Sequence, residues 1–321
     1  MAGRGQGPGW ADPPVSPFRA QDGNTVPGHV LPGYEEPGFP DPGYQGPGYQ
    51  QQGRPGTARP GWPPRRRRGR VIRRTLTVLG VIMLLIIIGF GVLLLVTPSA
   101  GNAQQLARAQ DKSHGVAYPG PPVPARFAKS LVATEDHRFY SDPGIDPFAV
   151  GRVALGYLEG KGGQQGGATI TQQLAKMLYT PGQSSPAAEA EQVAMAVKLD
   201  FTYSKAQILQ MYADVAYYGQ NYYSLGAASC GYFGVPPASM TWPQAALMAG
   251  VVQAPSSYDP LTAPAAAHAR EAHVLSRLVA TGVLTQSRAN AALSQPLHLV
   301  PRNQALAPPP KGSASCGSPA A

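Results

Sequence analysis

Cysteines and charged residues are scarce in this sequence of 321 residues. The two cysteines, Cys230 and Cys316, are too few for a thiolate metal site, and their positions alone leave open whether they form a disulfide. Charged residues make up only 13% of the chain, whereas 38 glycines and 35 prolines approach the content of low-complexity sequence. These counts predict that part of the chain does not fold.

A strand-like alternation of polar and apolar residues is also missing outside the two ends of the chain. Helical spacing recurs instead, with Ser204, Thr241 and Thr285 as expected N-caps and Gly282 as an expected helix end. The sequence therefore predicts a mainly α fold of many short helices, at 125–140, 147–159, 169–179, 189–201, 205–212, 225–233, 243–252, 265–281 and 286–293.

No charge interrupts residues 76–96, a run of 21 residues. At ~1.5 Å per residue it would extend roughly 32 Å, close to the ~30 Å hydrocarbon core of a bilayer. Seven arginines precede it between positions 65 and 74, and the first arginine after it is Arg108. This asymmetry predicts a single-pass membrane protein with a cytoplasmic N-terminus and an extracytoplasmic C-terminal part.

Four regions are expected along the chain. They are a disordered cytoplasmic tail with an arginine cluster at 1–75, a transmembrane helix at 76–96, an extracytoplasmic domain at 97–303 and a disordered tail at 304–321. The net charge of +9 lies mainly in the arginine cluster before the apolar run, not on a folded face with interleaved aromatic residues. The charge pattern therefore argues against a nucleic-acid partner.

Two segments of the expected domain could carry chemistry. Glu135 lies at the edge of an apolar stripe, among acidic neighbours, where a carboxyl group can act as an acid or base; a solvated helix face is the alternative. A glycine-rich stretch at 162–167 leads into a helix that carries Lys176, where an anion could bind; a flexible linker is the alternative. Each segment alone is weak support for a site.

The order of these segments is more specific. The first reads Glu135-Asp136-x-x-Phe139-Tyr140-x-x-x-Gly144-x-Asp146, and the second reads Gly167-x-Thr169-Ile170-Thr171-Gln172-Gln173-Leu174-x-Lys176. Further matching segments follow at 203–212, 232–234, 244–250 and 253–260. Over residues 110–300 the chain resembles the peptidoglycan glycosyltransferases, the transglycosylase module of bifunctional penicillin-binding proteins and of monofunctional cell-wall transglycosylases.

The resemblance implies a lysozyme-like helical glycosyltransferase domain behind the single N-terminal transmembrane helix. Its substrates would be lipid II and the growing glycan strand, joined by a β-1,4 linkage. It also implies Mg²⁺ or Mn²⁺ as an assisting cation. The cytoplasmic tail could bind cell-wall synthesis or division proteins, although a solvated tail without a fixed partner is the alternative.

The resemblance also assigns roles to residues. Glu135 would be the general base that deprotonates the acceptor hydroxyl, with Asp136 beside it in the catalytic site. The residues that would bind substrate are Phe139, Thr169, Gln172, Gln173, Lys176 and Gln192. Among them, Lys176 would balance charge on the lipid pyrophosphate.

Several positions depart from the family pattern. The third motif, Arg-Lys-x-x-Glu, falls on Ala188, Glu189 and Gln192, so two cations and one carboxylate are lost. The other departures are Asp142 for His, Ala168 for Ser, Met177 for Asn, Gln210 for Glu and Asp214 for Asn. The sequence thus predicts a weakened lipid II transglycosylase. The alternatives are an inactive homologue that binds lipid II or a partner, and a hydrolase.

Overall fold

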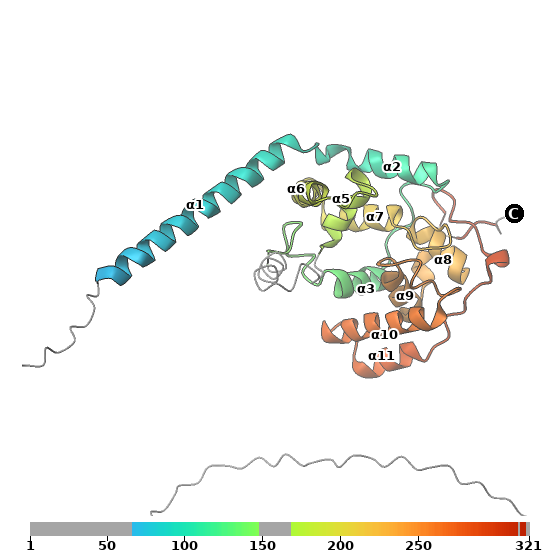
Figure 1. Ribbon diagram of the computed structural model, residues 1–321. Helices are drawn as coiled ribbons and strands as arrows, with labels where there is room; N and C mark the ends of the chain where they lie inside the picture. The colour runs from blue at the N-terminus through green and yellow to red at the C-terminus, as the bar shows by residue number, and fades with distance from the viewer. Residues whose placement is uncertain (1–65, 148–167, 314, 319–321) are drawn as a thin grey trace, which may run out of the picture. The chain divides into compact units, whose positions relative to one another are not determined.

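The computed structural model describes residues 66–147, 168–313 and 315–318. The chain divides into two units, Met1–Pro63 and Pro64–Ala321, and the description concerns the second. Its described residues are mainly helical and contain no strand, only an isolated bridge between Tyr217 and Tyr223, so the mainly α prediction is confirmed (Figure 1). The expected helix at 147–159 lies almost wholly outside the described residues.

The helices are α1 (Arg66–Val96), α2 (Ala103–Ser113), α3 (Ala125–Glu135), α5 (Ile170–Tyr179), α6 (Pro186–Thr202), α7 (Lys205–Val215), α8 (Leu225–Phe233), α9 (Trp242–Val251), α10 (Pro264–Ala280) and α11 (Gln286–Leu293). Short 3₁₀ turns occur at Ala100–Asn102, Pro237–Ser239 and Arg302–Gln304. Ser204, Thr241 and Thr285 each accept a backbone hydrogen bond as N-caps, as expected. Gly282 follows α10 with φ +74°, a conformation that glycine adopts without strain.

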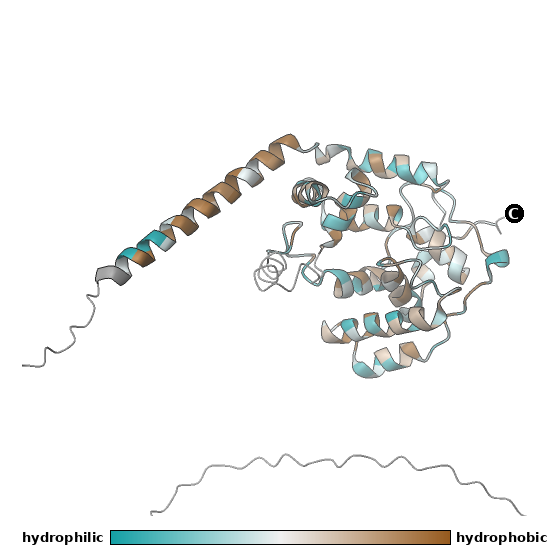
Figure 2. Ribbon diagram, in the orientation of Figure 1, coloured by the Kyte–Doolittle hydropathy of each residue, from teal (hydrophilic) through white to brown (hydrophobic). Residues whose placement is uncertain are grey.

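Helix α1 has 31 residues, and its segment Gly69–Val96 is long and apolar enough to cross a membrane. Figure 2 shows it as the most continuously hydrophobic element, with hydrophilic residues near its start. It begins ten residues before the expected position 76, since arginine is a good helix former and the basic residues continue the helix.

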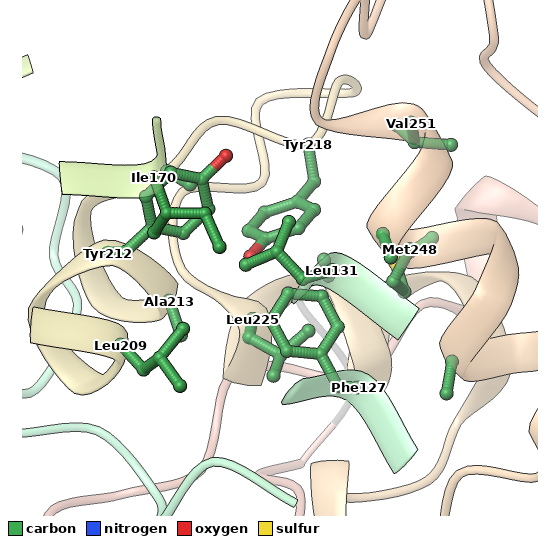
Figure 3. Packing of buried hydrophobic residues seen from close by; sticks show 14 of the residues in the cluster. Phe127, Leu131, Ile170, Leu209, Tyr212, Ala213, Tyr218, Leu225, Met248 and Val251 are labelled. Carbon is green, nitrogen blue, oxygen red and sulfur yellow. The ribbon is translucent and has the colours of Figure 1, made fainter. Parts of the chain in front are cut away.

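The core surrounds α9, whose residues Pro243–Val251 are all buried. Four of its 10 residues are alanine or glycine, and its neighbours α3 and α10 approach it closely. Figure 3 shows the adjoining apolar cluster, to which α3, α5, α7, α8 and α9 contribute Phe127, Leu131, Ile170, Leu209, Tyr212, Ala213, Leu225, Met248 and Val251. The core therefore joins the end of α3 to the helices that form the candidate site.

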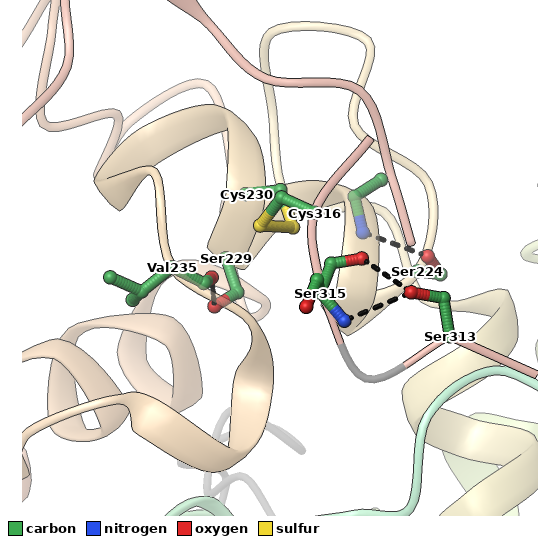
Figure 4. The surroundings of a disulfide bond; sticks show 8 residues. Ser224, Ser229, Cys230, Val235, Ser313, Ser315 and Cys316 are labelled. Atoms are coloured by element: carbon green, nitrogen blue, oxygen red, sulfur yellow. Dashed lines mark hydrogen bonds between the residues drawn. A yellow bond between two sulfur atoms is a disulfide. The ribbon is translucent and has the colours of Figure 1, made fainter. Parts of the chain in front are cut away.

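The C-terminal segment packs against α8 through a disulfide between Cys230 and Cys316 (Figure 4). The segment also pairs with itself, because Gly317 N donates to Ala307 O at 3.0 Å. The disordered tail expected at 304–321 is therefore not found in its described part. Composition alone could not reveal this order, because a covalent bond to α8 holds the segment.

Two buried acidic residues lie on the neighbouring helices α2 and α7. Asp111 is 1% exposed and Asp214 is 3% exposed, and neither Asp111 oxygen has a hydrogen-bond partner among the described residues. Burial, and secondarily the charge of Asp214, raises the pKa of Asp111 to about 8. Burial also raises the pKa of Asp214 to about 7, although hydrogen bonds from Gly120 and Gln210 oppose the shift.

This pair predicts that stability falls as pH rises. The folded chain binds more protons than the unfolded chain between the ordinary carboxyl pKa near 4 and the raised values of about 7 and about 8. The free energy of unfolding should therefore decrease through this window. Asp111→Asn should make the decrease of the unfolding free energy with pH less steep, by up to ~1.4 kcal/mol per pH unit. Thermal melts from pH 5 to 8 measure it, and an unchanged slope would contradict the prediction.

Candidate active site

Glu135 is the last residue of α3, and its side chain is 11% exposed. Both carboxylate oxygens have donors from other helices. Arg270 Nη2 on α10 donates to Oε1 at 3.0 Å, and Gln173 Nε2 on α5 donates to Oε2 at 3.1 Å. The next residue, Asp136, leaves the helical conformation with φ −155°, so the carboxylate projects from the very end of α3.

Gln173 has a fixed orientation because a tyrosine binds its other end. Tyr212 on α7 is buried, and its hydroxyl donates to Gln173 Oε1 at 2.8 Å. Burial, and secondarily the charge of Glu135, raises the pKa of Tyr212 well above its usual value, so the hydroxyl stays a proton donor. The amide NH₂ of Gln173 must then face Glu135.

The first turn of α5 uses two of the predicted substrate-binding residues for its own structure. Thr169 caps the helix by accepting from Gln172 N, and Gln172 Oε1 accepts from Thr169 N at 2.8 Å, which completes a capping box. The Thr169 hydroxyl also donates to Gly144 O at 2.6 Å. These contacts fix the start of α5 and, with it, the position of Gln173. A direct substrate contact of Thr169 and Gln172 stays a prediction.

Asp136 and Phe139 follow Glu135 in the chain, and both are buried. Asp136 is 6% exposed, and its Oδ2 accepts from Ile170 N at 3.2 Å, which joins the end of α3 to the start of α5. Burial, followed by the charge of Asp142, raises the pKa of Asp136 to about 7. The Phe139 ring is fully buried, with Lys205 Nζ 4.8 Å from its centroid. Asp136 therefore holds the turn after Glu135 against α5, and Phe139 N donates to Asp136 O at 3.0 Å in the same turn.

Asp142, at the position of the family's histidine, pairs with a lysine. Lys205 Nζ lies 3.3 Å from Asp142 Oδ1 and donates to the Asp142 backbone oxygen at 2.8 Å. Two residues on, Gly144 has φ +86°, and an added Cβ would lie 2.4 Å from Ala196 O, so glycine is required there. This turn therefore packs closely against α6 and α7.

The remaining predicted site residues lie further along α5 and α6. Lys176 is exposed, three residues after Gln173 and so on the same side of α5. Gln192 Nε2 donates to Thr180 Oγ1 at 2.9 Å, at the C-terminal end of α5. Thr180 follows Gln173 by seven residues. A rise of ~1.5 Å per residue makes this roughly 10 Å along the helix. Gln192 is therefore separate from the Glu135 carboxylate.

A family model described as Transglycosylase matches residues 102–279, more than half of the chain. The chain belongs to the transglycosylase family. The resemblance found in the sequence is thereby confirmed. The matched range begins at the end of the 3₁₀ turn before α2 and ends near the end of α10, so it contains Glu135, Gln173 and Arg270.

Similar proteins carry the name penicillin-binding protein 1A. That of Neisseria flavescens is 34% identical over 175 residues, covering 54% of this chain and 22% of the relative. Those of Streptococcus oralis and Haemophilus influenzae are 34% and 33% identical, each over 54% of this chain and over 28% and 20% of the relative. The chain thus spans between 20% and 28% of the length of these relatives.

Among solved structures, penicillin-binding protein 1A from Haemophilus influenzae matches 41% of this chain and 16% of its own. The sequence identity is 25% and the TM-score is 0.30, a value too low to compare folds.

Two of the departures from the transglycosylase pattern, Gln210 for Glu and Asp214 for Asn, compensate each other. Gln210 and Asp214 lie one turn apart on α7, and Gln210 Nε2 donates to Asp214 Oδ1 at 3.0 Å. The pair also binds the segment before α3, since Gly120 N donates to Asp214 Oδ1 and Val123 N donates to Gln210 Oε1. Where the family has Glu and Asn, this chain has Gln and Asp, so one carboxylate and one carboxamide remain with their places exchanged.

The third-motif departures have no such compensation. Helix α6 begins at Pro186, which places both Ala188 and Glu189 in its first turn. Ala188 is 3% exposed, so an arginine side chain has no room at this position without repacking. Glu189 is exposed, and its negative charge is favourable at a helix N-terminus. The two lost cations are therefore not replaced within this turn.

Arg270 and Tyr212 are the site residues to which sequence reasoning assigned no role. Arg270 lies 135 positions after Glu135, on α10. The sequence analysis found no motif around it. A single arginine on an amphipathic helix carries no local signal of function. Only the packing of α10 beside α3 brings it to the carboxylate.

The described residues show no preformed site for a divalent cation. They contain no cluster of three metal-binding side chains, and Asp142 pairs with Lys205, which also pairs with Asp200. Around Glu135 the contacting groups are a cation and an amide, not further carboxylates. The Mg²⁺ or Mn²⁺ implied by the resemblance stays a prediction, and no step below depends on it.

Proposed function

We propose that this transglycosylase polymerises lipid II into β-1,4-linked glycan strands with Glu135 as the general base. The observation that carries the proposal is the environment of Glu135 within the family match. Its carboxylate is largely buried at the end of α3, and two fixed donors orient it. Such preorganisation is what a catalytic carboxylate needs.

In the proposed reaction, Glu135 removes the proton from the 4-hydroxyl of the acceptor sugar. The oxygen attacks the anomeric carbon of the growing chain, and the bond from that carbon to the pyrophosphate oxygen breaks with inversion. The lipid pyrophosphate leaves with the electron pair, and the proton resides on Glu135. Lys176, which is exposed on the same side of α5 as Gln173, would stabilise the leaving anion.

The proposal is tested by incubating the purified full chain with fluorescent lipid II in detergent and separating the products by size. We expect long products that a muramidase degrades. Tight lipid II binding without polymer would favour the inactive homologue, the alternative that the changed third motif supports. A reducing disaccharide as the main product would favour a hydrolase.

The changed third motif predicts that one substitution accelerates the enzyme. Glu189→Lys reverses an exposed charge in the first turn of α6, where the family carries a cation. A change of ~1 kcal/mol is reasonable for an exposed pair, so the rate should rise by up to ~fivefold. Initial polymerisation rates measure it, with Glu191→Lys two residues further on as the control. Equal rates for Glu189→Lys and the wild type would show that this position does not face the anion.

We also propose that α1 anchors the domain in the membrane with the N-terminus in the cytoplasm. Beside the end of α1, Lys198 Nζ donates to the Thr97 and Pro98 carbonyls at 2.8 and 2.9 Å. Next to it, the Phe201 side chain is 83% exposed and lines a shallow cavity with Leu94. An exposed aromatic ring beside the end of a spanning helix suits the membrane interface.

The topology predicts where cysteines react in intact cells. Ser184→Cys, at an exposed position before α6, should react with an impermeant maleimide, whereas Ser16→Cys should react only after lysis. The native cysteines do not interfere because they are disulfide-bonded. Labelling of Ser16→Cys from outside would contradict the proposed orientation.

A further inference from the structure

Arg270 makes three contacts at the edge of the candidate site. Its Nη2 donates to Glu135 Oε1 at 3.0 Å, and its Nε donates to Gly250 O at 3.2 Å. Its guanidinium carbon lies 5.5 Å from the centroid of the Tyr258 ring. The side chains of Arg270 and Glu135 are each only 11% exposed, so this ion pair is largely shielded from water.

The surrounding residues leave Arg270 little freedom. A Cβ added at Gly250 would lie 2.7 Å from Arg270 Cγ, so the arginine stem passes directly over the glycine of α9. The planar guanidinium binds two acceptors at fixed angles, the Gly250 carbonyl and the Glu135 carboxylate. A lysine has a single ammonium group and cannot reproduce this geometry. The Gly250 contact therefore fixes the nitrogen that faces Glu135.

Resting on the proposed function, we propose that Arg270 is a positioning residue for the general base. It orients the Glu135 carboxylate toward the acceptor hydroxyl, and it does not itself contact substrate. A carboxylate offers about four lone-pair sites, of which Arg270 and Gln173 use two, so an acceptor site is left for the proton. The positive charge of Arg270 also balances the negative charge of the largely buried Glu135 carboxylate.

The expected effect is on turnover more than on substrate affinity. Misplacing a catalytic group by about 1 Å can cost 10²-fold in rate. Arg270→Met should therefore lower kcat by roughly 10²-fold with a much smaller change in KM. Arg270→Lys should recover part of the loss, because it restores the charge without the Gly250 contact. Loss of the cation should also move the acidic limb of the pH–rate profile to higher pH.

Other titratable groups near this pair could affect the same profile. They are His273 and Arg277 on α10 and Tyr212 on α7. Burial and the nearby cations of Arg270 and Arg277 lower the pKa of His273, so loss of Arg270 would shift this group as well. Arg270→Met is therefore also measured in a His273→Gln background. The shift of the acidic limb should persist there.

The matched control is Arg277→Met on the same helix. Arg277 Nε donates to Ala133 O at 3.2 Å, so it joins α10 to α3 without binding Glu135. This variant should keep the wild-type kcat while sharing any loss of helix packing, and in the His273→Gln background it should also keep the acidic limb of the pH–rate profile. If Arg270→Met behaves like Arg277→Met in both measurements, the inference is wrong.

A thermal-stability cycle separates this inference from the proposed function. The melting shifts of Arg270→Met and Glu135→Gln should be non-additive in the double variant, because the residues contact each other. Additive shifts would overturn the pairing whatever the activity. Absence of polymer from the wild type would overturn the proposed function and, with it, the role of Arg270 in catalysis, while the cycle would still report on the pairing.

Discussion

Glu135→Gln is expected to lower the polymerisation rate by roughly 10²- to 10⁴-fold, the usual contribution of a general base. The amide has nearly the same shape as the carboxylate, but at neutral pH it cannot take the proton from the hydroxyl of the acceptor sugar. It also leaves Arg270 without its anionic partner, so the variant should melt at a lower temperature. Initial rates with fluorescent lipid II measure the effect at a temperature where the variant is folded.

Glu271→Gln is the matched control for this change. Glu271 is a glutamate of α10 that is 1% exposed and 3.4 Å from His268. It undergoes the same chemical substitution in a buried place where its ion pair is with His268 and not with a residue of the candidate site, so the rate of this variant should stay near that of the wild type. Unchanged polymerisation in Glu135→Gln would remove Glu135 from the mechanism. Equal losses in both variants would point to folding and not to chemistry.

Cys230→Ser is expected to cause the largest loss of stability. The disulfide closes a loop with a sequence separation of 86 residues. Loop-closure entropy gives a loss of up to about 4–5 kcal/mol for such a loop. For a domain of this size the melting temperature should fall by roughly 10 °C or more. The C-terminal segment should also become sensitive to proteases, because its bond to α8 is lost.

The measurement compares thermal melts of the wild type, Cys230→Ser and Cys316→Ser with and without a reducing agent. Reduction should lower the wild-type melting temperature to that of the two variants and should leave the variants unchanged. Identical melting of wild type and variants under oxidising conditions would show that the bridge makes no contribution to stability.

Local signals in the sequence predicted much of the fold. The charge-free run before position 97 predicted the apolar part of α1. The expected N-caps Ser204, Thr241 and Thr285 predicted where three helices begin. Helix α2 was missed because it is mostly polar, and only Ala103, Ala107 and Asp111 are buried in it. Its buried positions follow helical spacing, but the two apolar residues among them are small alanines, so the pattern is weak in the sequence.

The candidate site was predictable only in part for a similar reason. Glu135 and Gln173 belong to motifs that can be read along the chain, and the structure places them in contact. Arg270 reaches Glu135 from a distant helix, and this contact depends on packing that no local pattern encodes. Tyr212 lies in the matching segment 203–212, but the sequence did not show that its hydroxyl binds Gln173. The order of the C-terminal segment depends likewise on a covalent bond between distant residues.

The most direct test of the central claim is the anomeric configuration of the product. The wild-type chain is incubated with lipid II labelled with ¹³C at the anomeric carbon of the reacting sugar, and the product is examined by NMR. Transfer with Glu135 as base predicts a β-1,4 glycosidic signal that appears as the lipid pyrophosphate signal disappears. A free reducing-sugar signal, or a substrate signal that does not change, would contradict the account.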